Sequence, residues 1–138
     1  MVNCNEKARI MGYMTDGVTF NVLRGANQNR QKEWPGNEKA DVPFRALEVA
    51  GEAGELSEAI KKLLRAERGI KGSTATREDV ADEMGDLLVS LDLLADALGI
   101  NLGEAVRQKF NRTSEKYGMR TYIGSDGDWH LHPEKPAA

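Results

Sequence analysis

Two long segments of the chain place apolar residues at the spacing of amphipathic α-helices, and this pattern constrains the fold more than any other feature of the sequence. The first segment covers residues 43–68, with a proline at its first turn and a glycine just beyond its end. The second covers residues 76–98, where the Thr76 hydroxyl can cap the helix and Asp79 follows three residues later. Both segments are therefore expected to be helices that bury one face.

Two shorter segments complete the predicted fold. A helix is expected over residues 18–32, because its apolar residues stand at helical spacing and the turn-forming sequence Trp34-Pro35-Gly36 follows. A last helix is expected from a cap at Asn101 to about Lys116. The chain is thus predicted to be all-α, with four helices. We expect three parts: an irregular N-terminal segment, 1–16; a helical domain, 17–123; and an irregular C-terminal tail, 124–138.

Composition limits what the chain can bind and where it works. The net charge is −3 and the pI is about 5.5, so no basic field is available to hold an extended nucleic acid. A free nucleotide is compatible with this charge, because divalent metals can bridge phosphates to acidic side chains. Cys4 is the only cysteine, which excludes an internal disulfide and favours the cytoplasm. No apolar stretch approaches the roughly 20 residues of a membrane span.

The two long helices share a short sequence with two acidic residues in each copy. It reads Glu52-Ala53-Gly54-Glu55-Leu56 in the first helix and Glu83-Met84-Gly85-Asp86-Leu87 in the second. At about 100° per residue, each acidic pair lies beside the leucine stripe of its own helix. Solvated residues such as Lys61 and Asp92 would lie opposite that stripe. If the two stripes face each other, the four carboxylates converge.

Converging carboxylates repel one another, so such a cluster takes up protons or binds a cation. Ligands that are all oxygen favour Mg²⁺ or Mn²⁺ and argue against zinc. A glycine inside a helix costs about 1 kcal/mol relative to alanine, so Gly54 and Gly85 are expected to let the two helices approach closely. The pattern predicts a metal site at the seam between the helices.

These motifs and their surroundings resemble the MazG-like family of all-α nucleoside triphosphate pyrophosphohydrolases, which carry E-x-x-E on one helix and E-x-x-D on the next. The run Phe44-Arg45-Ala46-Leu47-Glu48-Val49-Ala50-Gly51-Glu52-Ala53-Gly54-Glu55-Leu56 is similar to the branch that includes dCTP pyrophosphatases, as is Lys109-Phe110-Asn111 with Tyr117-Gly118. The resemblance covers about residues 20–123. It implies a four-helix bundle that hydrolyses (deoxy)nucleoside triphosphates to a nucleoside monophosphate and pyrophosphate.

The resemblance also implies which residues hold the metal. Mg²⁺ or Mn²⁺ would be bound by Glu52, Glu55, Glu83 and Asp86. One of the glutamates, Glu55 or Glu52, would also act as the general base. Many family members have a further glutamate where this chain has Gly51, which leaves the base and the number of metal ions open. Glu48, one turn earlier, could be an outer ligand or could pair with Arg45 or Lys62.

Six further residues are candidates for binding the substrate: Lys109, Asn111, Trp34, Lys62, Arg30 and Asn27. The resemblance implies that Lys109 and Asn111 lie near the phosphates. Lys62 could offset the triphosphate charge, or it could stabilise its helix end. Trp34 could stack on a base or pack in the core, and Asn27 and Arg30 lie on the polar face of the first helix. His130 and His132 lack further metal ligands and are left out of the site.

Other functions are compatible with the same pattern. A phosphoribosyl-ATP pyrophosphohydrolase would share the fold and the metal chemistry but not the substrate. A non-catalytic, nucleotide-binding helical oligomer would also have amphipathic helices and an acidic site. Because a chain this short has broad apolar stripes, we expect a homodimer or homotetramer to complete the bundle. The preferred base and sugar, and the biological role, stay open.

Overall fold

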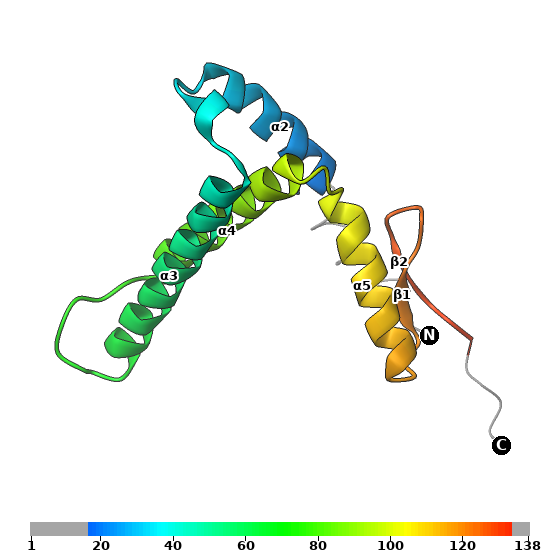
Figure 1. The fold of residues 1–138 in the computed structure, drawn as a ribbon. Helices are drawn as coiled ribbons and strands as arrows, with labels where there is room; N and C mark the ends of the chain where they lie inside the picture. Colours follow the sequence, from blue (N-terminus) through cyan, green and yellow to red (C-terminus); the bar gives the residue numbers. More distant parts are fainter. Residues whose placement is uncertain (1–16, 134–138) are drawn as a thin grey trace.

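The computed structural model describes residues 17–133, so the predicted N-terminal segment, 1–16, lies outside it. Four α-helices dominate this part of the chain and confirm the predicted all-α fold (Figure 1). The elements are α2 (Phe20–Glu33), the short 3₁₀ helix η1 (Asn37–Lys39), α3 (Val42–Glu67), α4 (Arg77–Ala97), α5 (Leu102–Lys116), β1 (Thr121–Ile123) and β2 (Trp129–Leu131). No helix in residues 17–133 is both long and apolar enough to cross a membrane.

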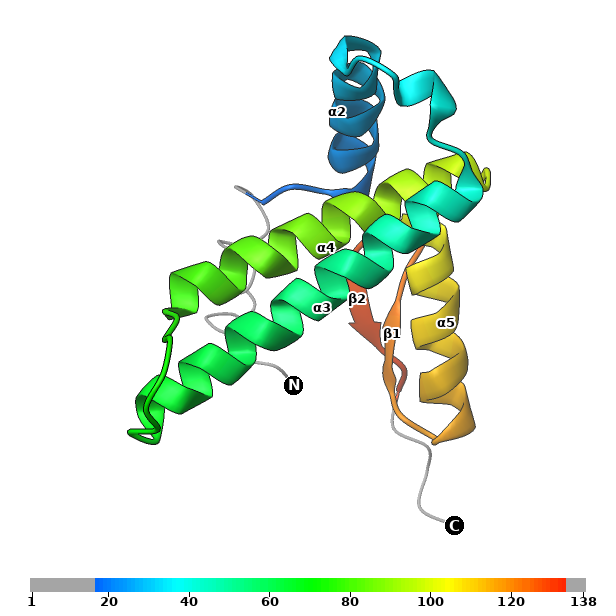
Figure 2. The same cartoon turned by 60° about the vertical axis from the view of Figure 1, so that its left-hand side comes forward.

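Helices α3 and α4 form an antiparallel pair that lies side by side in both views (Figures 1 and 2). The predicted cap of α4 is present: the Asp79 amide donates to Thr76 Oγ1 at 3.2 Å, and the Thr76 amide donates to Asp79 Oδ2 at 2.7 Å. Asp41 caps α3 in the same way, accepting from the Phe44 amide at 3.0 Å. Gly69, with φ of 64°, ends α3 in a conformation that favours glycine.

Helix α2 packs across one end of α4 through buried polar groups. Asp92 of α4 is 1% exposed; its carboxylate accepts from Arg24 Nε at 3.0 Å and from Asn27 Nδ2 at 2.9 Å. The expectation that Asp92 is solvated is therefore wrong. Asp92 does lie away from the leucine stripe, but a second helix covers that side of α4 and satisfies both carboxylate oxygens.

Helix α5 leaves the α3–α4 pair and forms a second arm with the β1–β2 hairpin (Figure 1). The strands pair antiparallel, with Tyr122 opposite His130. Asn111 joins the hairpin to α5, because its side-chain amide donates to the Ile123 carbonyl at 2.9 Å and its oxygen accepts from the Ile123 amide at 2.8 Å. The tail expected to be irregular thus contains β2, whose three residues are too few to show a strand periodicity.

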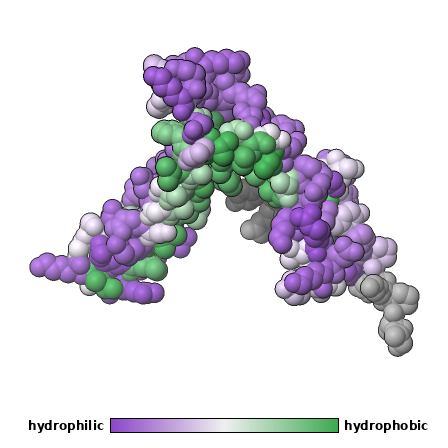
Figure 3. Space-filling model, in the orientation of Figure 1, coloured by the Kyte–Doolittle hydropathy of each residue, from purple (hydrophilic) through white to green (hydrophobic). Residues whose placement is uncertain are grey.

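The apolar core of a single chain is small. Within the described residues, the buried hydrophobic side chains are Ala59, Val80, Leu93 and Ala95. Much larger apolar side chains remain exposed, such as Leu47 at 73% and Met84 at 50%. Figure 3 shows apolar residues gathered at the surface where the α3–α4 arm meets α5. Within residues 17–133, many large apolar side chains of one chain are therefore exposed.

The two helix glycines do not mark a close approach of α3 to α4. A Cβ added at Gly54 or Gly85 would meet nothing within 4 Å beyond its own neighbourhood in the helix. The expectation of close packing at these positions is wrong. Each glycine follows its glutamate by two residues, so it lies about 200° around the helix, on the side away from the seam.

Candidate active site

Three of the four predicted carboxylates meet between α3 and α4. One oxygen from each of Glu52, Glu55 and Glu83 lies within 4.8 Å of the other two. The predicted fourth ligand, Asp86, is one turn beyond Glu83 on α4 and lines the adjoining pocket together with Glu52. We call Glu52, Glu55, Glu83 and Asp86 the carboxylate cluster.

The electrostatics of the carboxylate cluster favour a cation. Burial raises the pKa of Glu52, and the nearby charges of Glu55, Asp86, Glu83 and Glu48 raise this pKa further. One oxygen of Glu83, Oε2, is buried and finds no hydrogen-bond partner within residues 17–133. A buried carboxylate oxygen without a partner is costly, and a bound cation would remove that cost.

The donor atoms of the cluster fit a hard divalent cation. All of them are carboxylate oxygens, which Mg²⁺, Mn²⁺ and Ca²⁺ prefer, and neither cysteine nor histidine is among them. Three oxygens within reach of one another provide the convergent negative charge that such an ion requires. The residues present therefore fit the metal that the sequence pattern predicts.

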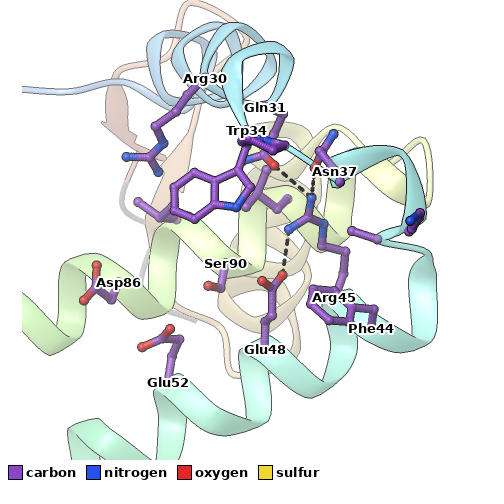
Figure 4. Close-up of a pocket in the computed structure, with 16 residues that line it drawn as sticks. Arg30, Gln31, Trp34, Asn37, Phe44, Arg45, Glu48, Glu52, Asp86 and Ser90 are labelled. Atoms are coloured by element: carbon purple, nitrogen blue, oxygen red, sulfur yellow. Dashed lines mark hydrogen bonds and ion pairs between the residues drawn. The ribbon is translucent and has the colours of Figure 1, made fainter.

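A pocket of about 500 Å³ opens beside the cluster. It lies between the end of α2, the turn of residues 34–40, the start of α3 and the middle of α4 (Figure 4). Its apolar lining is Trp34, Phe44, Val89 and Leu93, and its polar lining includes Arg30, Lys39, Glu52, Asp86 and Ser90. The pocket thus joins an aromatic wall and three basic residues, Arg30, Lys39 and Arg45, to one edge of the carboxylate cluster.

Trp34 lies at the rim of this pocket and not in the core. Its residue surface is 64% exposed, and Figure 4 shows its indole on the side of the pocket opposite Glu52. The guanidinium of Arg30 lies on the same side as the indole and faces Asp86 across the opening. Of the six predicted substrate-binding residues, Trp34 and Arg30 are the two that line the pocket.

The other four candidates are placed elsewhere. Asn27 is 2% exposed and donates to Asp92 and to the Val89 carbonyl, so it faces α4. Lys62 lies within 4.0 Å of Glu58 on its own helix. Asn111 is bonded to β1, and Lys109 is exposed on the α5 arm. Within one chain, the structure does not bring these residues to the cluster.

Sequence reasoning missed an arginine that organises the pocket wall. Arg45 is 7% exposed and donates to Glu48 Oε2 at 2.7 Å, to Gln31 Oε1 at 2.9 Å and to Asn37 Oδ1. Glu48 is thereby the partner of Arg45, which was one of its two expected roles. The sequence signal for this pair was the spacing of three residues on one helix. Nothing local indicated the contacts with Gln31 and Asn37.

Comparison with known proteins identifies related sequences. A family model described as the MazG nucleotide pyrophosphohydrolase domain matches residues 45–121, more than half of the chain. The chain is also 27% identical over 84 residues to the Gene 37 protein of Mycobacterium phage L5, covering 61% of this chain and 73% of that protein. The family match includes the whole carboxylate cluster and begins after Trp34.

Proposed function

Since the chain belongs to the MazG nucleotide pyrophosphohydrolase family, we propose that it hydrolyses a nucleoside triphosphate, with Mg²⁺ or Mn²⁺, to a nucleoside monophosphate and pyrophosphate. The observation that carries this proposal is the meeting of the Glu52, Glu55 and Glu83 carboxylates, one of which, Glu83, has a buried oxygen without a hydrogen-bond partner in residues 17–133. The pocket beside them offers room for a nucleoside, since small-molecule sites commonly span about 300–1,000 Å³.

The carboxylate cluster would hold the metal through its oxygens. When bound, a divalent cation neutralises phosphate oxygens and lowers the pKa of a water molecule. Glu55 is exposed, whereas Glu52 and Glu83 are half-buried. We propose that Glu55 also accepts the proton of the attacking water, because its carboxylate can reach solvent at the edge of the cluster.

The pocket would bind the nucleotide. The exposed indole of Trp34 offers a face on which a base can stack, a contact worth about 1–3 kcal/mol. The Arg30 guanidinium, opposite Asp86, is placed to donate hydrogen bonds to a phosphate. Val89 and Leu93 supply an apolar floor. With the base against Trp34, the phosphates would point toward the carboxylate cluster.

A second copy of the chain is proposed to cover the exposed apolar surface. Leu47 is 73% exposed, Met84 50% and Leu88 48%, and apolar surface of this extent favours association in water by about 25 cal/mol per Å² buried. A homodimer or homotetramer would bury such side chains. Sedimentation of the purified protein measures this directly, and a monomer at micromolar concentration would refute it.

The activity is tested by product analysis. The protein is incubated with ribo- and deoxynucleoside triphosphates, with dCTP among them, and with phosphoribosyl-ATP, in Mg²⁺ or Mn²⁺. Chromatography then separates monophosphate and pyrophosphate from diphosphate and orthophosphate. Turnover of phosphoribosyl-ATP alone would identify the protein as a phosphoribosyl-ATP pyrophosphohydrolase. Release of orthophosphate would contradict cleavage between the α and β phosphates. Binding without turnover would indicate a non-catalytic nucleotide-binding oligomer.

Two substitutions test the site. Glu52→Gln and Asp86→Asn each remove one charge of the cluster with little change in volume, and each is expected to lower kcat by at least about 100-fold. Matched controls are Glu67→Gln near the end of α3 and Asp82→Asn on α4, both exposed and outside the pocket. Full activity in both site variants would show that these carboxylates are not ligands.

A further inference from the structure

Arg45 joins three separate segments at the wall of the pocket. It stands in the first turns of α3 and is 7% exposed. Its guanidinium donates to Glu48 on α3, to Gln31 near the end of α2 and to Asn37 in η1, as the dashed lines of Figure 4 show. A buried arginine is costly unless its donors are satisfied. Here one planar group satisfies its donors with side chains from all three segments.

The turn of residues 34–40 carries Trp34 and needs such a link. Its own hydrogen bonds are local: Asn37 N to Trp34 O at 3.2 Å, Lys39 N to Gly36 O at 3.0 Å, and Ala40 N to Asn37 O at 3.0 Å. These bonds shape the turn, together with the positive φ of Gly36 at 81°. They do not fasten the turn to α3, whereas the bond from Arg45 to Asn37 does.

Arg45 also holds the Glu48 carboxylate in an ion pair. The Glu48 carboxylate lies one turn before Glu52 on α3, and both residues line the pocket. The Arg45 guanidinium lies 2.7 Å from Glu48 Oε2, so the two charges offset each other and the carboxylate is held by its partner. Glu48 thus lies beside the carboxylate cluster as the ion-pair partner of Arg45.

We propose that Arg45 is a positioning residue for nucleotide binding: it fixes the Trp34-bearing turn against α3 and holds Glu48 in an ion pair beside the carboxylate cluster. This inference rests on the proposed function, since it takes the pocket under Trp34 as the nucleotide site. Arg45 itself contacts neither the reacting phosphates nor the metal in this proposal. Its effect passes through the turn to the indole.

Three substitutions remove the contacts of Arg45 in different combinations. Arg45→Met removes both the charge and the hydrogen bonds while keeping an unbranched side chain. Arg45→Lys keeps a charge for Glu48 but lacks the planar fork that reaches Gln31 and Asn37. Asn37→Ala removes the link to the turn and leaves the ion pair with Glu48 in place.

The expected kinetic result is a rise in KM with little change in kcat. A wall that contacts the base contributes equally to ground state and transition state, so its loss changes KM. We expect KM for the best nucleotide to rise about tenfold in Arg45→Met and in Asn37→Ala, with kcat within about twofold of wild type. Arg45→Lys should resemble Asn37→Ala. The control Arg77→Met, exposed at the start of α4, should leave both constants unchanged.

A second readout does not depend on activity. The chain has two tryptophans, so Trp129→Phe leaves Trp34 as the single fluorescent indole. In this background, without nucleotide, Arg45→Met and Asn37→Ala should increase the fast component of the time-resolved fluorescence anisotropy of Trp34, because the turn loses its link to α3. Arg77→Met should not. If Arg45→Met fails to fold by circular dichroism, Asn37→Ala and Arg45→Lys carry both measurements.

The outcomes are distinct. Unchanged anisotropy in all folded Arg45 and Asn37 variants overturns the positioning role. A larger fast component with unchanged KM, or a loss confined to kcat, overturns the link between the turn and nucleotide binding. If the wild type hydrolyses no nucleotide, the proposed function fails, and the anisotropy still decides whether Arg45 fixes the turn.

Discussion

Removing one charge from the carboxylate cluster should stabilise the metal-free protein. The perturbation is Glu52→Gln, which keeps the size of the side chain. Two unit charges 4.8 Å apart, the limit within which Glu52, Glu55 and Glu83 meet, repel by about 1 kcal/mol in a water-like dielectric. Glu52 has two such neighbours, and salt screens part of the repulsion. We therefore expect the free energy of unfolding to rise by about 1 kcal/mol at pH 7.5 in EDTA and low salt.

The pH dependence of the free energy of unfolding provides a second test of the predicted stabilisation. The pKa of Glu52 is raised in the folded protein above its ordinary value of 4.5, first by burial and then by its acidic neighbours. The folded state therefore binds this proton more tightly than the unfolded state. The associated stability is present below pH 4.5 and is lost as the pH rises through the raised pKa. Glu52→Gln should remove this pH-dependent loss of stability. The variant should therefore have a higher free energy of unfolding than wild type at neutral pH, and the difference should vanish in acid.

Urea unfolding followed by circular dichroism measures both effects, with Glu67→Gln as the control for a charge removed elsewhere on α3. Adding Mg²⁺ or Mn²⁺ should make wild type more stable than Glu52→Gln. A ligand that binds only the folded state stabilises it, and the variant lacks one of the proposed oxygen ligands. A Glu52→Gln protein that is less stable than wild type in EDTA at pH 7.5, or a stability that Mg²⁺ and Mn²⁺ leave unchanged in wild type, would refute the reasoning.

Three further substitutions test contacts that hold α2 and the hairpin in the fold. Asp92→Ala should lower the free energy of unfolding by about 2–3 kcal/mol in urea, because it leaves the Arg24 guanidinium beside α4 without its buried partner; a loss below about 0.5 kcal/mol would contradict this. Asn111→Ala should cost about 1–2 kcal/mol and broaden the hairpin resonances in NMR, since both bonds to β1 are lost; an unchanged hairpin spectrum would contradict it. In Gly124→Ala the new Cβ would stand 2.5 Å from Asp126 Oδ1, so the pKa of Asp126, which its hydrogen bond with a histidine lowers, should rise toward its ordinary value in an NMR titration.

The sequence predicted the carboxylate cluster because helical phase is a local property. Glu52 and Glu83 each lie beside the leucines of their own helix, and two helices joined by a short loop bring those stripes together. The ends of the long helices were predictable for the same reason, since the Thr76 cap and Gly69 act on neighbouring residues. These local features were predicted correctly, but the expectation of close packing at Gly54 and Gly85 was wrong although helical phase decides the side on which they lie.

The other errors arose where a distant segment decides the environment of a residue. The helical periodicity of α4 gives no information about α2, so it could not show that Arg24 and Asn27 of α2 cover Asp92. The β1–β2 hairpin depends on Asn111, twelve residues before Ile123, and its three-residue strands carry no periodicity of their own. The contacts of Arg45 with α2 and η1 likewise join residues whose types gave no indication of pairing.

The candidate site is divided between the α3–α4 pair and the turn that precedes it, and this division affects how the specificity of such a protein can evolve. The carboxylates stand on α3 and α4, inside the segment that matches the family model, residues 45–121. The indole proposed to meet the base stands on the turn before that segment. If the proposed roles hold, substitutions in residues 20–40 would exchange one preferred base for another without altering the carboxylates proposed to hold the metal. The residues proposed to select the base and those proposed to hold the metal can then vary independently, and the Arg45 guanidinium connects the two segments through its hydrogen bonds.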